Sequence, residues 1–418
     1  MLRRLVFALI VLLITAMAAP FAGPLSSGAL LLLLPVHANP EPHNLPASYE
    51  PVHRGGIDLS TGLYTRRDED LLLRETPHLV LRRLYISKYH VSREFGVGTT
   101  HSGEKGLAGD GKDWQWVQMY PSDSGQLVKF TRISPGRSFV NALYEHSDPS
   151  NEFHGARVGW IGFRWVMRLR DGRQLNFLRC TKSMRTCPVI EERDPAGHSI
   201  SYRRTFEGRL LRMEALPNRW IAFDYDDLER ITRAHDSGGR EVRYEYDAGG
   251  RLAVVRAPEG VVRRYTYTGR DEMQTIEQPD IFIENTYNSD GRVVRQVNRF
   301  PGESAPYTFD FTYKTTDNSV RSTEVRRSDM TWTIYTFDGN REVMSESWGS
   351  SVTPPVSVKY ERDPQTREVT SVTVTCADRT GQQSAHPRLV SNGRWERERD
   401  DLIEIYCSSG WRNRREVK

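Results

Sequence analysis

Alternation between hydrophobic and polar positions dominates the second half of this chain. Val242, Tyr244 and Tyr246 lie on one face of an extended segment, and the charged residues between them lie on the other. A period of two residues is typical of a β-strand with one buried face. Asp and Gly residues follow over 247–250, where their backbone preferences favour a tight turn, and the alternation then resumes. This segment therefore predicts a β-hairpin.

The same plan recurs with an aromatic residue leading each turn. From Phe206 to Tyr287 these lead residues are spaced 19, 21, 21 and 20 residues apart, and weaker copies follow at Tyr313, Phe337 and Tyr360. A fixed period of this size predicts stacked supersecondary units, because one hairpin cannot bury its aromatic face alone. The residues expected to build the repeat turns are Tyr225, Asp226, Tyr246, Asp247, Gly250, Arg251, Tyr287, Gly291 and Arg292.

The N-terminus has the form of an export signal. Arg3 and Arg4 precede a long apolar region, and Val36-His37-Ala38 resembles a cleavage site. A signal anchor that is not cleaved is the alternative, because the apolar region is unusually long. The expected segments are a signal peptide or anchor (1–38), a proline-rich linker (39–51), an N-terminal β module (52–190), the hairpin array (191–370) and a C-terminal cap (371–418).

The expected fold class is all-β. Stacked antiparallel hairpins would form a curved sheet or partial shell, and the cap would cover its open end, since open sheet edges and repeat arrays need protection. Four cysteines suit an exported protein. Pairing Cys180 with Cys187 and Cys376 with Cys407 is the simplest of three possible connectivities, and the second pair would tie the cap back to the array.

Net charge is only +4, which makes no strong demand for nucleic acid. Arginines and glutamates alternate on the polar faces of the strands and predict a solvated, ion-paired exterior. We therefore expect no nucleic-acid partner, and no membrane span after the N-terminal signal unless that signal is retained as an anchor.

Two blocks of the chain resemble a known family. The tyrosine-led turns are similar to the YD repeats of the Rhs (rearrangement hotspot) and teneurin-like superfamily. The block before them resembles the N-terminal module of bacterial Rhs proteins, although Thr99 stands where that family usually has tryptophan. The matching residues of this block are Asp58, Thr61, Gly62, Arg83, Tyr85, Ser87, Phe95, Gly96 and Gly98. The resemblance implies that the β-sheet of the module leads directly into the repeats.

Segments that could carry chemistry have simpler interpretations. Residues 106–112 have the spacing of a phosphate-binding loop, but Asp113 replaces the Ser or Thr that would bind magnesium, so we expect a flexible turn. His146 and His154 flank Asp148 in a polar loop, which only weakly suggests a metal or acid–base site. The carboxylate pairs Asp226-Asp227 and Glu191-Glu192 could suit glycoside hydrolysis, although turn chemistry already explains the first. No catalytic, cofactor-binding or metal-binding residue is predicted, and no cofactor is expected.

The leading functional hypothesis is an exported, non-enzymatic protein. It would act as a binding or scaffold module at the cell envelope or outside the cell, with glycans or proteins as its partners. One alternative is a truncated Rhs-type shell that encloses or chaperones a separately encoded toxin. Toxin-bearing relatives end their shell with an Asp-Pro-x-Gly motif, and here Asp194-Pro195-Ala196-Gly197 lies before the repeats instead. The second alternative is an exported polysaccharide hydrolase.

Overall fold

Extended strands make up nearly all of the regular structure in the computed structural model of this chain. The structure describes residues 52–53, 55–110, 113–120, 127–149, 152–179, 186–351, 355–377 and 383–389. The chain divides into two units, Met1–Glu41 and Pro42–Lys418, and all of the described residues belong to the second. Helices in these ranges are limited to the short 3-10 turns η1 (Phe139–Asn141) and η2 (Pro258–Gly260), which confirms the all-β prediction. None of the described helices has the length and hydrophobicity of a membrane-crossing segment.

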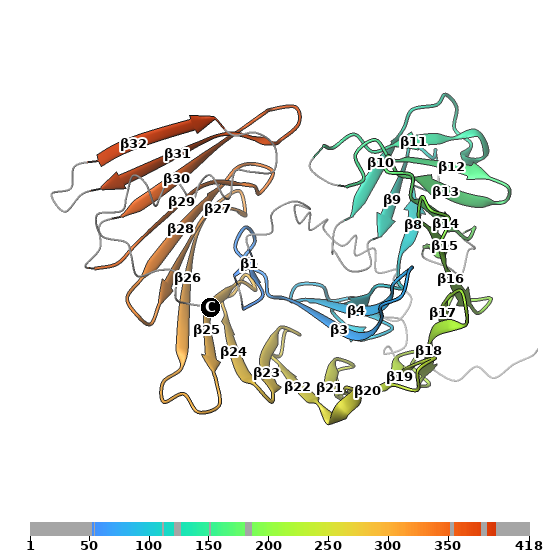
Figure 1. The fold of residues 1–418 in the computed structure, drawn as a ribbon, viewed down its shortest axis with the longest axis horizontal. Coiled ribbons are helices and arrows are strands. Elements are labelled where there is room, and N and C mark those ends of the chain that lie inside the picture. Colours follow the sequence, from blue (N-terminus) through green and yellow to red (C-terminus); the bar gives the residue numbers. More distant parts are fainter. Residues whose placement is uncertain are drawn as a thin grey trace, which may run out of the picture. The chain divides into compact units, whose positions relative to one another are not determined.

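The hairpin array runs in sequence order, each strand pairing antiparallel with the next (Figure 1). Its strands are β16 (Ser199–Arg204), β17 (Leu210–Ala215), β18 (Arg219–Tyr225), β19 (Ile231–Asp236), β20 (Glu241–Tyr246), β21 (Leu252–Arg256), β22 (Val262–Tyr267), β23 (Met273–Gln278), β24 (Ile281–Tyr287), β25 (Val293–Arg299), β26 (Tyr307–Thr316), β27 (Ser319–Arg327), β28 (Trp332–Phe337), β29 (Val343–Gly349), β30 (Val356–Arg362), β31 (Val369–Ala377) and β32 (Gln383–Leu389). The last two strands carry the same pairing into the segment predicted to be the cap.

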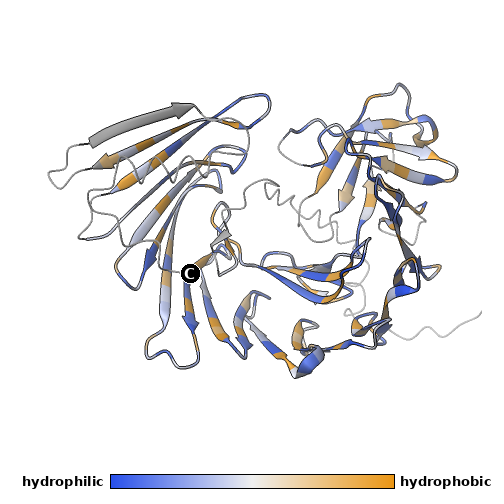
Figure 2. Cartoon of the chain, in the orientation of Figure 1, coloured by the Kyte–Doolittle hydropathy of each residue, from blue (hydrophilic) through white to orange (hydrophobic). Residues whose placement is uncertain are grey.

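The alternation along these strands separates a buried face from an exposed one, and Figure 2 shows hydrophobic and hydrophilic residues taking turns along them. In β20, Val242 and Tyr244 are buried, whereas Arg243 and Glu245 are exposed. A slip of one residue would exchange the two faces, so burial of one face fixes the register. A β-bulge interrupts the pairing where β20 enters its turn, at Tyr246, and the same irregularity recurs at other lead positions.

A closed ring of strands precedes the array. β8 pairs with β9 on one side and with β15 on the other, so the described strands from β8 to β15 close on themselves. The ring strands are β8 (Gly106–Gly109), β9 (Trp116–Tyr120), β10 (Val128–Arg132), β11 (Leu143–Glu145), β12 (Arg157–Ile161), β13 (Arg164–Arg168), β14 (Gln174–Phe177) and β15 (Cys187–Arg193). β15 also pairs with β16, which joins the ring to the array.

Aromatic side chains fill the ring. The rings of Trp160 and Trp165 meet edge to face with their centroids 5.4 Å apart, and Trp114 lies 5.7 Å from Trp165. The Tyr144 hydroxyl donates to the Trp114 carbonyl at 3.0 Å. Alternation along β11 to β13 therefore directs the aromatic residues inward and leaves the intervening residues on the outer face.

Residues 55–104, which we call the packing segment, cover the buried face of the array. The strands at this end of the chain are β1 (Val52–His53), β2 (Ile57–Asp58), β3 (Thr65–Leu73), β4 (Leu79–Ile86), β5 (Ser92–Arg93), β6 (Gly96–Val97) and β7 (Thr99–His101). Backbone bonds tie this segment to successive hairpins: the Ile231 amide donates to the Glu94 carbonyl at 2.7 Å, and the Val293 amide donates to the Gly62 carbonyl at 2.9 Å. The packing segment thus supplies apolar surface that single hairpins cannot provide for themselves.

One expectation for the N-terminal half is wrong. Residues 106–109 were expected to lie in a flexible turn, but they form β8, whose glycines lie in the sheet between β9 and β15. Gly106 needs its small size there, because a Cβ would lie 3.0 Å from the Thr186 side chain. Lys112, which ended the predicted loop, lies outside the described residues.

Several other predictions fall wholly or partly outside the described residues. These are the export signal (1–38), the linker (39–51) and the end of the cap, together with Cys180 and Cys407. Cys187 and Cys376 are buried on β15 and β31, and no free thiol occurs among the described residues. The two disulfide pairings and the disulfide-tied cap stay predictions.

Candidate functional site: the repeat turns and an arginine groove

The turns of the array are closed by an acidic or amide side chain that follows the lead residue. Asp247 Oδ1 accepts a hydrogen bond from the Arg251 backbone amide at 2.9 Å, and Asp247 Oδ2 accepts one from Arg251 Nε at 2.7 Å. Asp226 binds Arg230 in the same two ways. In the turn after Tyr287, Asn288 Oδ1 accepts a hydrogen bond from the Arg292 backbone amide at 3.0 Å. A carboxylate or amide at this position therefore locks a tight turn, as Asx-type turns do.

Gly250 and Gly291 occupy the position just before the turn arginine. Both have φ of +76°, in the left-handed region that glycine adopts without steric cost. Glu229 takes the same place in the turn after Tyr225 with φ of +60°. Glycine is thus favoured at this position but is not required by the turn.

Each turn is also tied to the one before it. The Tyr246 hydroxyl donates to the Ile231 carbonyl at 2.6 Å, while the Arg230 guanidinium lies over the Tyr246 ring, 4.4 Å from its centroid. The hydroxyl bonds that repeat this arrangement are Tyr225 to Leu210, Tyr267 to Leu252, Tyr287 to Met273 and Tyr313 to Val293. Arg209 stacks on Tyr225, and Arg251 stacks on Tyr267, each with 5.0 Å to the ring centroid. We call this series of contacts the tyrosine ladder.

The ladder gives the predicted turn residues a structural role. Burial raises the pKa of Tyr246 and of Tyr225, so both hydroxyls remain protonated donors at neutral pH. The arginines neutralise the turn carboxylates and cover the rings at the same time, through cation–π contacts. Tyr225, Asp226, Tyr246, Asp247, Arg251, Tyr287 and Arg292 are therefore committed to contacts within the array.

The first turn departs from the sequence-based alignment. The sequence pattern predicts Phe206 as its lead aromatic residue, but the Phe206 side chain is 86% exposed. The bulge of this hairpin instead falls at Arg204, which lies 21 residues before Tyr225. The Arg204 guanidinium donates hydrogen bonds to the carbonyls of Val189, Gly208 and Gly103. It thus ties this turn to neighbouring backbone, as the tyrosine hydroxyls do in the later turns. An aromatic signal two residues away concealed this position in the sequence.

The packing segment is held to the array by a buried ionic cluster. Arg83 Nε lies 2.5 Å from Asp70 Oδ2, and the two side chains are 4% and 0% exposed. The Tyr244 hydroxyl of the array donates to the same carboxylate at 2.8 Å. The neighbouring Asp68 accepts hydrogen bonds from Arg66 at 2.8 Å and from the Tyr265 hydroxyl at 3.2 Å. Two carboxylates and two arginines of one segment are thus completed by tyrosines of the other.

The cluster makes stability depend on pH. Burial opposes ionisation of Asp68, but Arg83 and Arg66 outweigh it and hold its pKa below the ordinary value of 3.8. A lowered pKa in the folded state stabilises the protein fully above pH 3.8 and progressively less as pH falls towards the folded-state pKa. We expect the unfolding free energy of Asp68→Asn to change less with pH below 3.8 than that of the parent, measured by urea unfolding. The control variant Glu245→Gln, at an exposed position, should retain the parental pH dependence. If the unfolding free energy of Asp68→Asn changed with pH as steeply as that of the parent, Asp68 would not be the source of this pH dependence.

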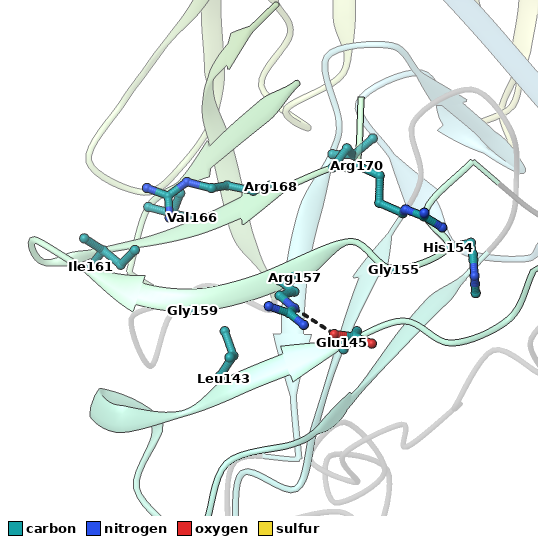
Figure 3. A pocket seen from close by; sticks show the side chains of 11 residues that line it. Leu143, Glu145, His154, Gly155, Arg157, Gly159, Ile161, Val166, Arg168 and Arg170 are labelled. Carbon is teal, nitrogen blue, oxygen red and sulfur yellow. Dashed lines mark hydrogen bonds and ion pairs between the residues drawn. The ribbon is translucent and has the colours of Figure 1, made fainter. Parts of the chain in front are cut away.

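A groove lies on the outer face of the ring, over β11, β12 and β13 (Figure 3). Its volume is about 710 Å³. Cross-strand register places Gly159 opposite Leu143 on one side and opposite Val166 on the other, so the absent side chain leaves a hollow between two aliphatic residues. Leu143, Ile161 and Val166 line this floor. We call the whole feature the arginine groove because of its walls.

Three exposed arginines stand around the floor of the arginine groove. Arg157 binds Glu145 at 2.7 Å, and Arg168 Nε lies 3.3 Å from the amide oxygen of Gln174. Arg170 makes no ion pair with any residue that the structure describes. Arg157 and Arg168 lie directly opposite each other on adjacent strands, an arrangement in which like charges repel. The groove therefore has an excess of positive charge that an anion could balance.

The remaining sequence candidates are not brought together into one site. His146 is buried and its Nδ1 lies 2.7 Å from the Lys129 carbonyl, whereas His154 lies at the wall of the arginine groove. Asp227 is exposed in its turn, and Glu191 is paired with Arg193 at 2.7 Å. No group of three or more potential metal ligands occurs within the described ranges. The sequence does not reveal the groove, because its walls lie on neighbouring strands. Alternation within a strand does not give the register between strands.

Comparison with known proteins agrees with the repeat geometry. The family model described as RHS Repeat matches residues 225–262, and one described as a domain of unknown function (DUF6531) matches residues 54–130. The probable deoxyribonuclease RhsA of Dickeya dadantii (strain 3937) is 37% identical over 67 residues, which cover 16% of this chain and 5% of that protein. Double-stranded DNA deaminase toxin A of Burkholderia cenocepacia (strain H111) is 24% identical over 309 residues, which cover 68% of this chain and 20% of that protein.

The chain thus spans no more than about a fifth of the length of these relatives. Among solved structures, the one titled TcdB2-TccC3-TEV aligns with 78% of this chain and 19% of its own, at 11% identity and a TM-score of 0.38. The family-model matches cover the packing segment and the first strands of the ring (54–130), and part of the tyrosine-led turns (225–262). The RHS Repeat match and the similarity to Rhs proteins support an Rhs/YD-repeat family protein.

Proposed function

We propose that this protein is a non-enzymatic binding module, exported to the cell envelope or beyond, in which the array is a rigid frame and the arginine groove is the ligand site. One observation carries the proposal: three exposed arginines and a single paired carboxylate surround a preformed concave floor. The arginines of the array, by contrast, are largely used within the fold, in turns and in ion pairs between neighbouring strands. The expected ligand is anionic.

A disulfide-tied end of the array belongs to the same proposal. An exported chain has access to oxidising conditions, and the buried positions of Cys187 and Cys376 suit structural bridges to Cys180 and Cys407. Such bridges would keep the frame intact outside the cell.

Binding to anionic polymers tests the proposed ligand site. The purified exported chain should bind polyglutamate in titration calorimetry, and the double variant Arg168→Gln/Arg170→Gln should bind it at least about tenfold more weakly, because each charge-assisted contact is worth about 1.5–3 kcal/mol. The matched control is Arg243→Gln/Arg256→Gln, which removes two exposed arginines that pair with Glu241 and Glu245 on the array. Equal losses in both double variants would mean that net charge alone attracts the polymer, and would overturn the proposal.

A shell for a separately encoded toxin is the second candidate. Two of the relatives are a probable deoxyribonuclease and a DNA deaminase toxin, which favours this candidate. Yet the packing segment already occupies the buried face of the array from Leu210, beside Glu94, to Thr323, which donates to the Leu59 carbonyl at 2.6 Å. Co-purification of a small protein encoded next to this chain would favour the shell, whereas its absence from the purified material would favour the binding module.

A further inference from the structure

We infer that the arginine groove takes an acidic protein segment, bound in extended conformation with its aliphatic side chains on the floor and its carboxylates at the walls. This inference rests on the proposed function and names the class of its ligand. Its basis is the particular combination of side chains that the ring register brings to one face.

The floor selects for aliphatic groups. Gly159 has no side chain, and a Cβ built there would meet only the Ala142 carbonyl at 3.6 Å and a Leu143 methyl at 3.9 Å, so the space above it is open. Leu143 is 37% exposed and Ile161 is 46% exposed. The apolar surface continues from the floor to Ile133, whose amide donates to the Leu143 carbonyl at 2.9 Å and whose side chain is 53% exposed. An aliphatic side chain placed here would remove apolar surface from water on both partners.

The walls select for carboxylates. Arg157 already holds Glu145 in a 2.7 Å ion pair, which shows the geometry in which this face accepts a carboxylate. Arg168 stands opposite Arg157 in register and has only the neutral Gln174 as a hydrogen-bonding partner among the described residues. A second carboxylate between the two arginines would relieve their repulsion and form charge-assisted bonds. Charge complementarity therefore points to an acidic partner.

Aromatic content argues for a protein segment over an acidic glycan. Sugar rings are commonly held on the faces of Trp, Tyr or Phe, and no such residue lines the described groove. The ring does contain these residues, but alternation directs Tyr144, Trp160 and Trp165 to its interior. The outer face is left with aliphatic and guanidinium groups, which match the alternating side chains of an extended peptide. Successive side chains of such a peptide point to opposite sides, so acidic and aliphatic residues can serve wall and floor in turn.

Three probes of equal charge separate the possibilities: a 12-residue peptide with alternating Glu and Leu, its Glu and Ser counterpart, and an oligogalacturonate. We expect the intact exported chain to bind the Glu-Leu peptide at least about tenfold more tightly than the other two in fluorescence anisotropy. Gly159→Val should abolish this preference by filling the hollow, and the fold should survive because valine suits a strand. Met344→Ser, at a 44% exposed position on the array, is the control and should keep the preference.

The remaining outcomes distinguish this inference from the proposed function. Oligogalacturonate binding as tightly as the Glu-Leu peptide, with dependence on Arg168 and Arg170, would overturn the peptide assignment and leave the anion site standing. Equal binding of the two peptides would also overturn it, because the floor would then contribute nothing. Binding of all three probes that is unchanged by the arginine substitutions, or no binding of any probe, would overturn both.

Discussion

Replacing Arg83 with leucine is expected to lower the unfolding free energy by about 3–5 kcal/mol, because it leaves a buried carboxylate without its main counter-charge. The Arg83 and Asp70 side chains are 4% and 0% exposed, so water cannot take the place of the guanidinium. Arg263 lies 3.7 Å from Asp70 and the Tyr244 hydroxyl donates to it, but neither replaces the bidentate contact. Urea unfolding followed by tryptophan fluorescence measures the change.

The matched control is Arg256→Leu, which breaks an ion pair with Glu245 whose two side chains are 45% and 52% exposed. Surface pairs contribute about 0–1 kcal/mol, so this substitution should have little effect. Similar losses at the two positions would show that the packing segment is not held by the buried cluster. An intact array with a protease-sensitive segment 55–104 in Arg83→Leu would locate the damage at the interface between them.

Removing the Tyr246 ring is expected to cost about 3 kcal/mol, the lower end of the usual range for a buried aromatic side chain, because this ring is partly buried against the core. The ring contacts the packing segment as well as Arg230, and Gly96 approaches it so closely that a Cβ there would lie 3.2 Å from two of its carbons. Tyr246→Phe should cost only about 1–3 kcal/mol, because it keeps the ring and leaves the Ile231 carbonyl without its donor. Thermal unfolding of both variants separates packing from hydrogen bonding.

Tyr307→Ala serves as the comparison for this pair, since Tyr307 is 48% exposed at the start of β26. We expect it to lower stability far less than Tyr246→Ala. If the Tyr246→Phe and Tyr246→Ala losses were equal, the hydroxyl bond would account for the whole effect, and the packing role of the ring would be wrong.

Local chemistry made the hairpins predictable. Asp247 and Gly250 have intrinsic turn preferences, and the alternation around Tyr244 carries its own face assignment, so no distant contact is needed to recognise the unit. Alternation along β4 likewise puts Arg83 on one buried face with Leu79 and Leu81. That Asp70 would neutralise it could not be predicted, since this depends on how β3 lies against β4.

Closure of the ring could not be predicted from local sequence patterns either, because it also depends on how distant strands pair. The pairing of Leu107 with Cys187 joins residues far apart in the chain, and the sequence of neither strand indicates which strand it pairs with. The arginine groove depends on that ring, because Arg157 and Arg168 become neighbours only through the β12–β13 register. The position of Arg204 could not be predicted for a different reason. Arginine stands there in place of the usual tyrosine, and the nearby Phe206 gives the aromatic signal expected of a lead residue.

The tyrosine ladder joins only adjacent turns, so by itself it would tolerate the gain or loss of a whole unit through duplication or deletion. The packing segment imposes the opposite constraint, because its fixed length must meet particular hairpins from Arg204, which bonds the Gly103 carbonyl, to Thr323, which bonds the Leu59 carbonyl. The length of the packing segment therefore limits how many hairpins it can contact. In related proteins, the number of hairpins that contact this segment should be conserved together with its length, and the number of hairpins should vary freely only after Thr323.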